Sequence, residues 1–214
     1  MNIVFDFGAV LFAWQPVQLV AHHFPERAAT LAEAQQLAQA IFHHTDWQGF
    51  DMGTVALDEV VDRTAMRLNM QADKLHSVLA PIGEQLAPIA CNVALLAQLR
   101  ERRSRHGDLK LYFLSNMPEP FARALERRFD FLQWFDGGIF SSDVKLGKPD
   151  PGIYHLLASR YRFDAARTLF VDDSRANVDA ADALGWQTIH CDDPEQLPDK
   201  FLNKFDLQRL MGKR

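Results

Sequence analysis

The stretch Asn2-Ile3-Val4-Phe5-Asp6-Phe7-Gly8 decides the fold of this chain of 214 residues. The apolar residues 3–5 predict a buried strand, and Gly8 interrupts it. Asp6 therefore lies where the strand opens into a loop, at the rim of a core. An aspartate after a strand usually stabilises a turn or caps a helix, so Asp6 by itself does not indicate a function.

The same arrangement recurs further along the chain. Residues 111–116 (Leu-Tyr-Phe-Leu-Ser-Asn) and residues 168–173 (Thr-Leu-Phe-Val-Asp-Asp) each run from an apolar strand into polar side chains. Residues 148–151 (Lys-Pro-Asp-Pro) form a turn that brings a lysine to the start of a helix. Ligands of open α/β sheets bind beyond the carboxyl ends of the strands. We therefore expect one site built from Asp6, Ser115, Asn116, Lys148, Asp172 and Asp173.

Strands and helices alternate in the second half of the chain, which predicts a parallel sheet. The expected strands are 2–6, 109–115, 137–141, 168–172 and 187–191, and the expected helices between them include 89–103, 119–128, 151–160 and 176–184. Residues 13–86 lack a convincing strand, and their apolar residues recur with helical spacing, most clearly over 57–68. The fold class is therefore α/β, with a Rossmann-like parallel sheet core (1–12 and 87–214) and an inserted α-helical block (13–86).

Composition excludes several classes of function. The net charge is −5 with no basic stripe, so nucleic acid is not an expected partner. No apolar run approaches the ~20 residues that span a membrane, and the amino terminus lacks a charged leader region. Cys91 and Cys191 lie far apart and predict no disulfide framework. We expect a cytoplasmic protein with two unpaired cysteines.

Four segments resemble the motifs of the haloacid dehalogenase-like (HAD) superfamily of hydrolases, in the family's order. They are residues 5–11 (Phe-Asp-Phe-Gly-Ala-Val-Leu), 113–116 (Phe-Leu-Ser-Asn), 147–154 (Gly-Lys-Pro-Asp-Pro-Gly-Ile-Tyr) and 170–177 (Phe-Val-Asp-Asp-Ser-Arg-Ala-Asn). The resemblance implies that the helical block is a cap domain that closes over the active site.

The resemblance also implies a role for each site residue. Asp6 is the expected nucleophile, Ser115 and Lys148 orient the phosphate and the nucleophile, and Gly8 and Asn116 contact the substrate. Mg²⁺ is expected on Asp6, on the backbone carbonyl of Gly8 and on Asp172 and Asp173, with Asp173 the more direct ligand and Asn177 supporting the set. This assignment is chemically coherent, because a carboxylate that attacks a dianionic phosphate needs cations nearby and carboxylate oxygens suit Mg²⁺.

Gly8 departs from the family pattern. Most family phosphatases carry a second aspartate at this position, which acts as the general acid for the leaving alcohol. Loss of a general acid costs about 10²–10⁴ in rate. Three explanations stay open: a leaving group that needs little protonation, such as an anomeric sugar oxygen; a proton donor in the cap; or a weak or inactive member. A family branch that acts on glucose 1-phosphate opens with a similar Asp-x-Gly motif.

Three functions follow. The first is a Mg²⁺-dependent phosphatase that acts through an aspartyl-phosphate on a small phosphorylated metabolite, such as a sugar phosphate. The second is a 2-haloacid dehalogenase that uses Asp6 without metal, and the third is a non-catalytic member of the fold.

Among cap residues, His22, His23, His43 and His44 are expected at helix ends or on the surface, with at most one of each adjacent pair facing the site. Trp14 and Trp47 are expected in the interior of the cap.

Overall fold

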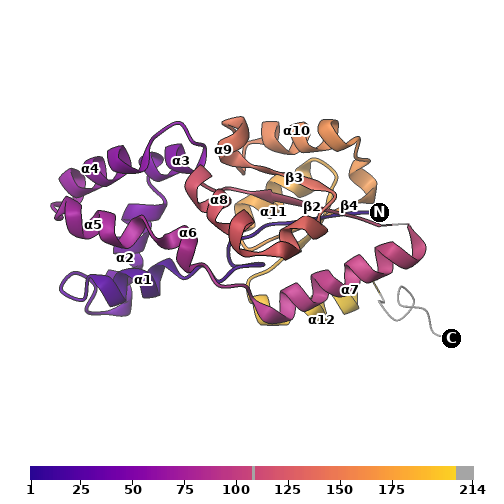
Figure 1. Cartoon of the computed structure of the whole chain (residues 1–214), viewed down its shortest axis with the longest axis horizontal. Coiled ribbons are helices and arrows are strands. Elements are labelled where there is room, and N and C mark those ends of the chain that lie inside the picture. Colours follow the sequence, from indigo (N-terminus) through magenta and orange to yellow (C-terminus); the bar gives the residue numbers. More distant parts are fainter. Residues whose placement is uncertain (108, 206–214) are drawn as a thin grey trace.

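The computed structural model describes residues 1–107 and 109–205 and is built around one parallel sheet (Figure 1). Its five strands are β1 (Asn2–Phe5), β2 (Lys110–Ser115), β3 (Gly137–Phe140), β4 (Thr168–Asp172) and β5 (Gln187–His190). They lie in the order β3-β2-β1-β4-β5, and each neighbouring pair is parallel. The predicted fold class is confirmed, and each observed strand falls within its expected range.

Alternating residues of the strands divide the core into two layers, as the period of two in a strand requires. Ile3, Phe5 and Val171 face one way and belong to a cluster with side chains of α7 (Ala90–His106), α8 (Glu119–Arg128) and α12 (Leu197–Phe205). Val4 and Phe170 face the other way and pack with side chains of α10 (Pro151–Tyr161) and α11 (Arg175–Ala183). Because both faces are covered, β4 is buried throughout and the centres of β1 and β2 are largely buried, which explains why these strands read as continuous apolar runs.

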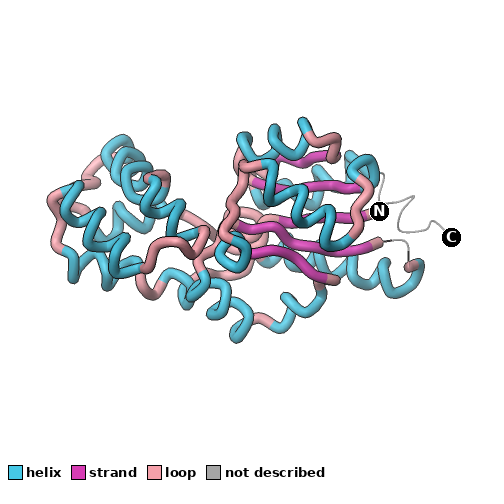
Figure 2. The backbone as a smooth tube through the Cα atoms, turned by 90° about the horizontal axis from the view of Figure 1, so that it is seen from above, coloured by secondary structure: helices cyan, strands magenta, loops and turns pink. Residues whose placement is uncertain are grey.

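Six helices form a group of their own beyond the carboxyl ends of the strands (Figures 1 and 2). They are α1 (Pro16–His23), α2 (Leu31–Phe42), α3 (Thr45–Asp51), α4 (Leu57–Leu68), α5 (Ala72–Leu79) and α6 (Ile82–Gln85). Local sequence sets their ends. Thr30 and Glu33 form a reciprocal capping box before α2, and Asn69 ends α4 in the left-handed conformation. This group is the helical insertion.

The chain leaves and re-enters the core at adjacent points. The Ala13 amide donates to the Ala87 carbonyl over 2.8 Å, and the Ile89 amide donates to the Leu11 carbonyl over 2.8 Å. These two bonds support the predicted boundaries of the insertion at residues 13 and 86, which stay a prediction.

The insertion also contacts the core through α3, which lies against the short helix α9 (Ser141–Val144), and through α6, which lies against α8. The remaining elements are the 3-10 turns η1 (Asp130–Trp134), η2 (Ala165–Arg167) and η3 (Pro194–Gln196). Within the described part of the chain, no helix has the length and apolarity needed to cross a membrane. Cys91 and Cys191 are both free, as expected.

Candidate active site

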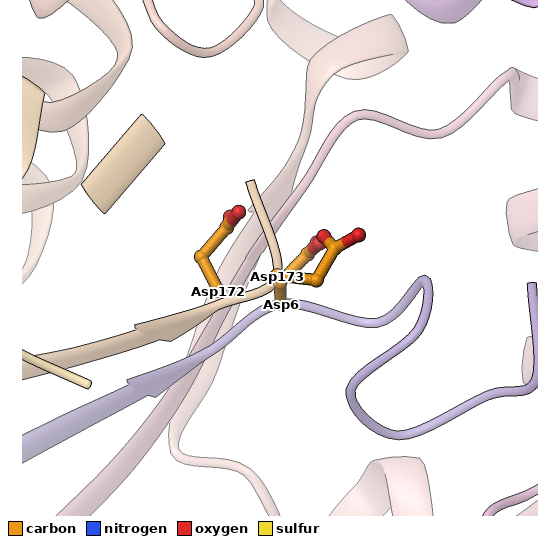
Figure 3. A group of neighbouring side chains, drawn as sticks. All are labelled: Asp6, Asp172 and Asp173. Carbon is orange, nitrogen blue, oxygen red and sulfur yellow. The ribbon is translucent and has the colours of Figure 1, made fainter. Parts of the chain in front are cut away.

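Two neighbouring strands bring the carboxylates together. Asp6 follows β1, and Asp172 ends β4. These two strands are paired in parallel at the middle of the sheet, with β2 and β3 on one side of them and β5 on the other. The Asp6 amide donates to the Val171 carbonyl over 2.9 Å, which continues the ladder as far as the site. Figure 3 shows Asp6, Asp172 and Asp173 extending beyond the strand ends. One oxygen of each lies within 4.8 Å of the others, so these three predicted residues share one site.

Lys148 links two of the acids. Its Nζ lies 2.8 Å from Asp6 Oδ1 and 2.5 Å from Asp172 Oδ2, and its side chain is 1% exposed. The loop that carries Lys148 is held by Asn116, whose amide accepts from the Lys148 amide (2.8 Å) and donates to the Lys148 carbonyl (2.9 Å). Asp150 caps the following helix by accepting from the Gly152 amide. The predicted substrate contact Asn116 therefore also fixes the lysine loop.

The adjacent aspartates Asp172 and Asp173 differ in their hydrogen bonds and in their access to the cavity. Asp172 Oδ1 accepts from the Ser174 amide (2.8 Å) and from Asn177 Nδ2 (3.0 Å), while Asp172 Oδ2 accepts from Lys148. Asp172 is fully buried, whereas Asp173 is half-buried and lines the cavity described below. Asn177 thus helps to hold Asp172, and the predicted roles of Asp173 as the more direct ligand and Asn177 as a supporting residue stay predictions.

The electrostatics of the site favour a cation. Burial raises the pKa of Asp6 to about 7, with Lys148 opposing the rise and Asp172 and Asp173 adding to it. Burial and the charge of Asp172 raise the pKa of Asp173 to about 6. Burial alone lowers the pKa of Lys148, but the carboxylates of Asp172 and Asp6 bring it above its ordinary value. The single ammonium group of Lys148 cannot neutralise three carboxylates, so a further cation would stabilise the site. Carboxylate oxygens are the ligands that Mg²⁺ prefers. The residues present fit the predicted ion.

Ser115 ends β2 beside these groups. Its hydroxyl is buried, and among the described residues it has no hydrogen-bond partner. Buried polar groups are nearly always satisfied, so a group in this state is suited to a ligand oxygen. Its catalytic role stays a prediction.

A cavity of about 480 Å³ opens above the acids, between the sheet and the helical insertion. The predicted residues that line it are Asp6, Gly8, Asn116, Lys148, Asp173 and Asn177, whereas Ser115 and Asp172 are buried and do not line it. The lining also contains a set of apolar side chains, called the apolar wall below: Trp14, Phe42, Trp47, Ile82, Leu86 and Phe121. Trp47 is buried in the hydrophobic core, as expected, whereas Trp14 is only partly buried and packs against that core, and both line the cavity.

The cap histidines follow the expected pattern. His43 lines the cavity. His44 instead caps α3 by accepting from the Asp46 amide, and its Nδ1 lies 2.8 Å from Asp46 Oδ2. His22 and His23 end α1 and contact each other.

Asp51 also lines the cavity, although no sequence pattern predicts it as a site residue. Asp51 is the last residue of α3 and shares the cavity with Asp6 and Lys148. Its sequence context, Gly49-Phe50-Asp51-Met52-Gly53, is that of an ordinary helix end before a turn. Only the folding of α3 against the core brings Asp51 to the site, so the sequence carries no signal for it.

Comparison with known proteins agrees with this geometry. The family model of haloacid dehalogenase-like hydrolases matches residues 3–185. The sesquiterpene phosphatase astK of Aspergillus oryzae is 27% identical over 98% of this chain and 95% of its own length. A phosphorylated carbohydrates phosphatase of Thermotoga maritima is 24% identical over 88% of this chain and 83% of its own length.

A solved structure shares the fold. A HAD family enzyme of Bacteroides thetaiotaomicron, in complex with magnesium and inorganic phosphate, matches with a TM-score of 0.66 at 20% identity, over 88% of this chain and 92% of that chain. With four motifs in order, their side chains gathered at one edge of the sheet and a family model that covers most of the sequence, the chain belongs to the haloacid dehalogenase-like hydrolases.

Proposed function

We propose that this protein is a Mg²⁺-dependent phosphatase that hydrolyses a small phosphomonoester through an aspartyl-phosphate on Asp6. The observation that carries the proposal is the cluster of Asp6, Asp172 and Asp173 around the buried Lys148. Phosphoryl transfer depends mainly on positioning and charge neutralisation, and this cluster offers both at one strand edge.

Each group has a part in the reaction. Asp6 attacks the phosphorus, Lys148 and the Ser115 hydroxyl hold phosphoryl oxygens, and water then hydrolyses the aspartyl-phosphate. Asp6, the Gly8 carbonyl and Asp173 would hold Mg²⁺, with Asp172 and Asn177 fixing the set. When bound, the ion supplies positive charge that offsets the repulsion between the carboxylate and the phosphate.

The two alternatives are weaker. A dehalogenase that uses Asp6 without metal has no need of a second acidic pair, yet Asp172 and Asp173 lie within reach of Asp6. A non-catalytic protein has no need of a buried lysine paired with two carboxylates, because such a group is costly to bury. Gly8 is the only feature in favour of this last alternative.

The apolar wall of the cavity indicates the kind of alcohol. Trp14, Phe42, Trp47 and Phe121 line it, and Lys148 is the only lysine or arginine among the lining side chains of the described residues. A second anionic group on the substrate would find no arginine or lysine of its own there. We infer a monoester whose alcohol part is at least partly hydrophobic, in keeping with the name of the Aspergillus relative. Glucose 1-phosphate, suggested by the Asp-x-Gly motif, is the contrasting candidate.

A hydrolysis screen tests this function. Purified protein is assayed with 4-nitrophenyl phosphate, farnesyl phosphate and glucose 1-phosphate, with Mg²⁺ or with EDTA, beside the Asp6→Asn variant. We expect Mg²⁺-dependent release of phosphate that Asp6→Asn abolishes, and faster turnover of farnesyl phosphate than of the sugar phosphate. Activity that persists in EDTA or in Asp6→Asn contradicts the proposed chemistry, and a preference for glucose 1-phosphate contradicts only the inferred alcohol.

A further inference from the structure

The cavity contains one carboxyl group that the proposed chemistry has not used. Asp51 comes from the helical insertion and lines the same cavity as Asp6, Lys148 and Asp173, the groups that hold phosphate and metal. It is not one of the three clustered acids that fit the metal. A carboxyl group that lines this cavity and is not needed for the metal is available to the leaving alcohol instead.

The core fixes the position of Asp51 although the residue belongs to the insertion. The Ser141 hydroxyl donates to the Asp51 carbonyl and accepts from the Met117 amide (2.9 Å), just beyond the end of β2. Two residues along the chain, the Gly53 carbonyl accepts from Lys145 Nζ over 2.8 Å. The end of α3 is thus tied to α9 and, through Ser141, to the strand end that carries Ser115 and Asn116.

The surroundings keep this carboxyl group protonated near neutral pH. Burial raises the pKa of Asp51 to about 8, the negative charge of Asp6 adds to the rise, and Lys148 opposes it. Two further acids line the cavity: Asp150 accepts from the Gly152 amide, and Asp173 belongs to the metal set. Lys145 bonds the Gly53 and Ser142 carbonyls, Asp46 pairs with Arg63 and His44, and His43 is exposed. A protonated carboxyl group is a hydrogen-bond donor and a proton source.

Gly8 has no side chain, so the core domain supplies no general acid at this position. The side of the backbone where an aspartate would begin faces Trp14, whose Cβ lies 3.7 Å from the position of an added Cβ. We propose that Asp51 is the general acid of the phosphoryl transfer, delivered by the helical insertion in place of the carboxyl group that is missing at position 8. The inference rests on the proposed phosphatase function and selects the cap donor among the three explanations for Gly8.

A bond forms between an Asp6 carboxylate oxygen and phosphorus as the bond from phosphorus to the alcohol oxygen breaks. The electron pair of the broken bond stays on the alcohol oxygen, which takes the Asp51 proton and leaves as a neutral alcohol. Water then attacks the phosphorus of the aspartyl-phosphate and releases the Asp6 carboxylate. One proton of the water stays on the phosphate and the other passes to solvent, from which the Asp51 carboxylate is protonated again. His44 does not compete for the role, because it caps α3 and does not line the cavity.

The experiment compares the wild-type protein and Asp51→Asn on a series of phosphate esters with Mg²⁺, from 4-nitrophenyl phosphate to a simple alkyl phosphate. A general acid matters most when the leaving group is poor. We expect kcat for the 4-nitrophenyl ester to change by less than about threefold and kcat for the alkyl ester to fall by about 10²–10⁴. Asp46→Asn, on the same helix but outside the cavity, serves as the matched control and is expected to leave the dependence on the leaving group unchanged.

A second variant and a second measurement separate catalysis from structure. Gly8→Asp has room for its Cβ, and in the Asp51→Asn background we expect it to restore part of the alkyl activity. With the wild-type protein, kcat for the alkyl ester should decline at high pH while that for the aryl ester does not. Equal losses on every ester in Asp51→Asn, or an alkyl kcat that stays flat at high pH, overturn the role of Asp51. Failure of the wild type to hydrolyse even the aryl ester instead contradicts the proposed function.

Discussion

At the scale of single residues, the adjacent Asp172 and Asp173 have different environments, so their replacement should affect different properties of the protein. Asp172 is fully buried and holds Lys148, so Asp172→Ala leaves a buried ammonium with one partner fewer. We expect it to lower the free energy of unfolding by about 3 kcal/mol. Asp173→Ala leaves that pair intact and should weaken Mg²⁺ binding at least tenfold with little loss of stability. Urea denaturation and titration with Mg²⁺ measure the two effects, and the reverse pattern would show that Asp172 is the direct ligand.

Sequence reasoning found the residues that end apolar strands and missed the one that does not. Asp6, Ser115 and Asp172 follow buried runs, and the carboxyl ends of parallel strands meet at one edge. Lys148 was found because its loop leads into a helix with a recognisable start. Asp51 ends a seven-residue helix in the insertion, and its position depends on tertiary contacts with α9. No local pattern encodes such a contact.

At the scale of elements, the tie between α3 and α9 carries a testable consequence. Ser141→Ala removes the hydroxyl that joins the Asp51 carbonyl to the Met117 amide. We expect a loss of about 1 kcal/mol in stability and, because Asp51 loses its support, a fall of about tenfold in alkyl ester hydrolysis with a much smaller effect on aryl esters.

The neighbouring serine is a matched control for that variant. Ser142 is also buried on α9, and its hydroxyl has no hydrogen-bond partner among the described residues. Ser142→Ala should therefore change neither the stability nor the preference between esters by a comparable amount. Equal effects of the two substitutions on the alkyl-to-aryl ratio would show that the tie does not position Asp51.

Sequence periodicity predicts the long elements well and the short helices poorly. The strands and the helices α4, α8 and α10 lie close to their predicted ranges, because long apolar periodicity is a strong signal. The short helices α5 and α6 and the terminal helix α12 were not predicted as separate elements. A helix of a few residues shows too few turns of periodicity, and the apolar residues Leu197 and Phe201 of α12 reveal their role only when packed against the sheet.

At the scale of the whole molecule, the buried acids make stability depend on pH. The pKa of Asp51 is raised to about 8 and that of Asp6 to about 7, whereas both lie near 4 in an unfolded chain. The folded protein therefore binds more protons between about pH 4 and pH 8, and its stability falls as the pH rises through this window. In EDTA we expect Tm to decline from pH 5.5 to pH 8.5. Asp51→Asn should make the decline shallower, and an unchanged slope would contradict the raised pKa of Asp51.

The most direct test of the whole account is a search for the phosphoryl group on Asp6. The protein is mixed with 4-nitrophenyl phosphate and Mg²⁺, quenched in acid within milliseconds, digested and analysed by mass spectrometry. We expect a transient phosphoryl group on the peptide that contains Asp6, formed and lost at rates that match turnover and absent in Asp6→Asn. Hydrolysis that proceeds with no phosphoryl group on this peptide, or with one on another residue, would contradict the central claim that Asp6 is the nucleophile.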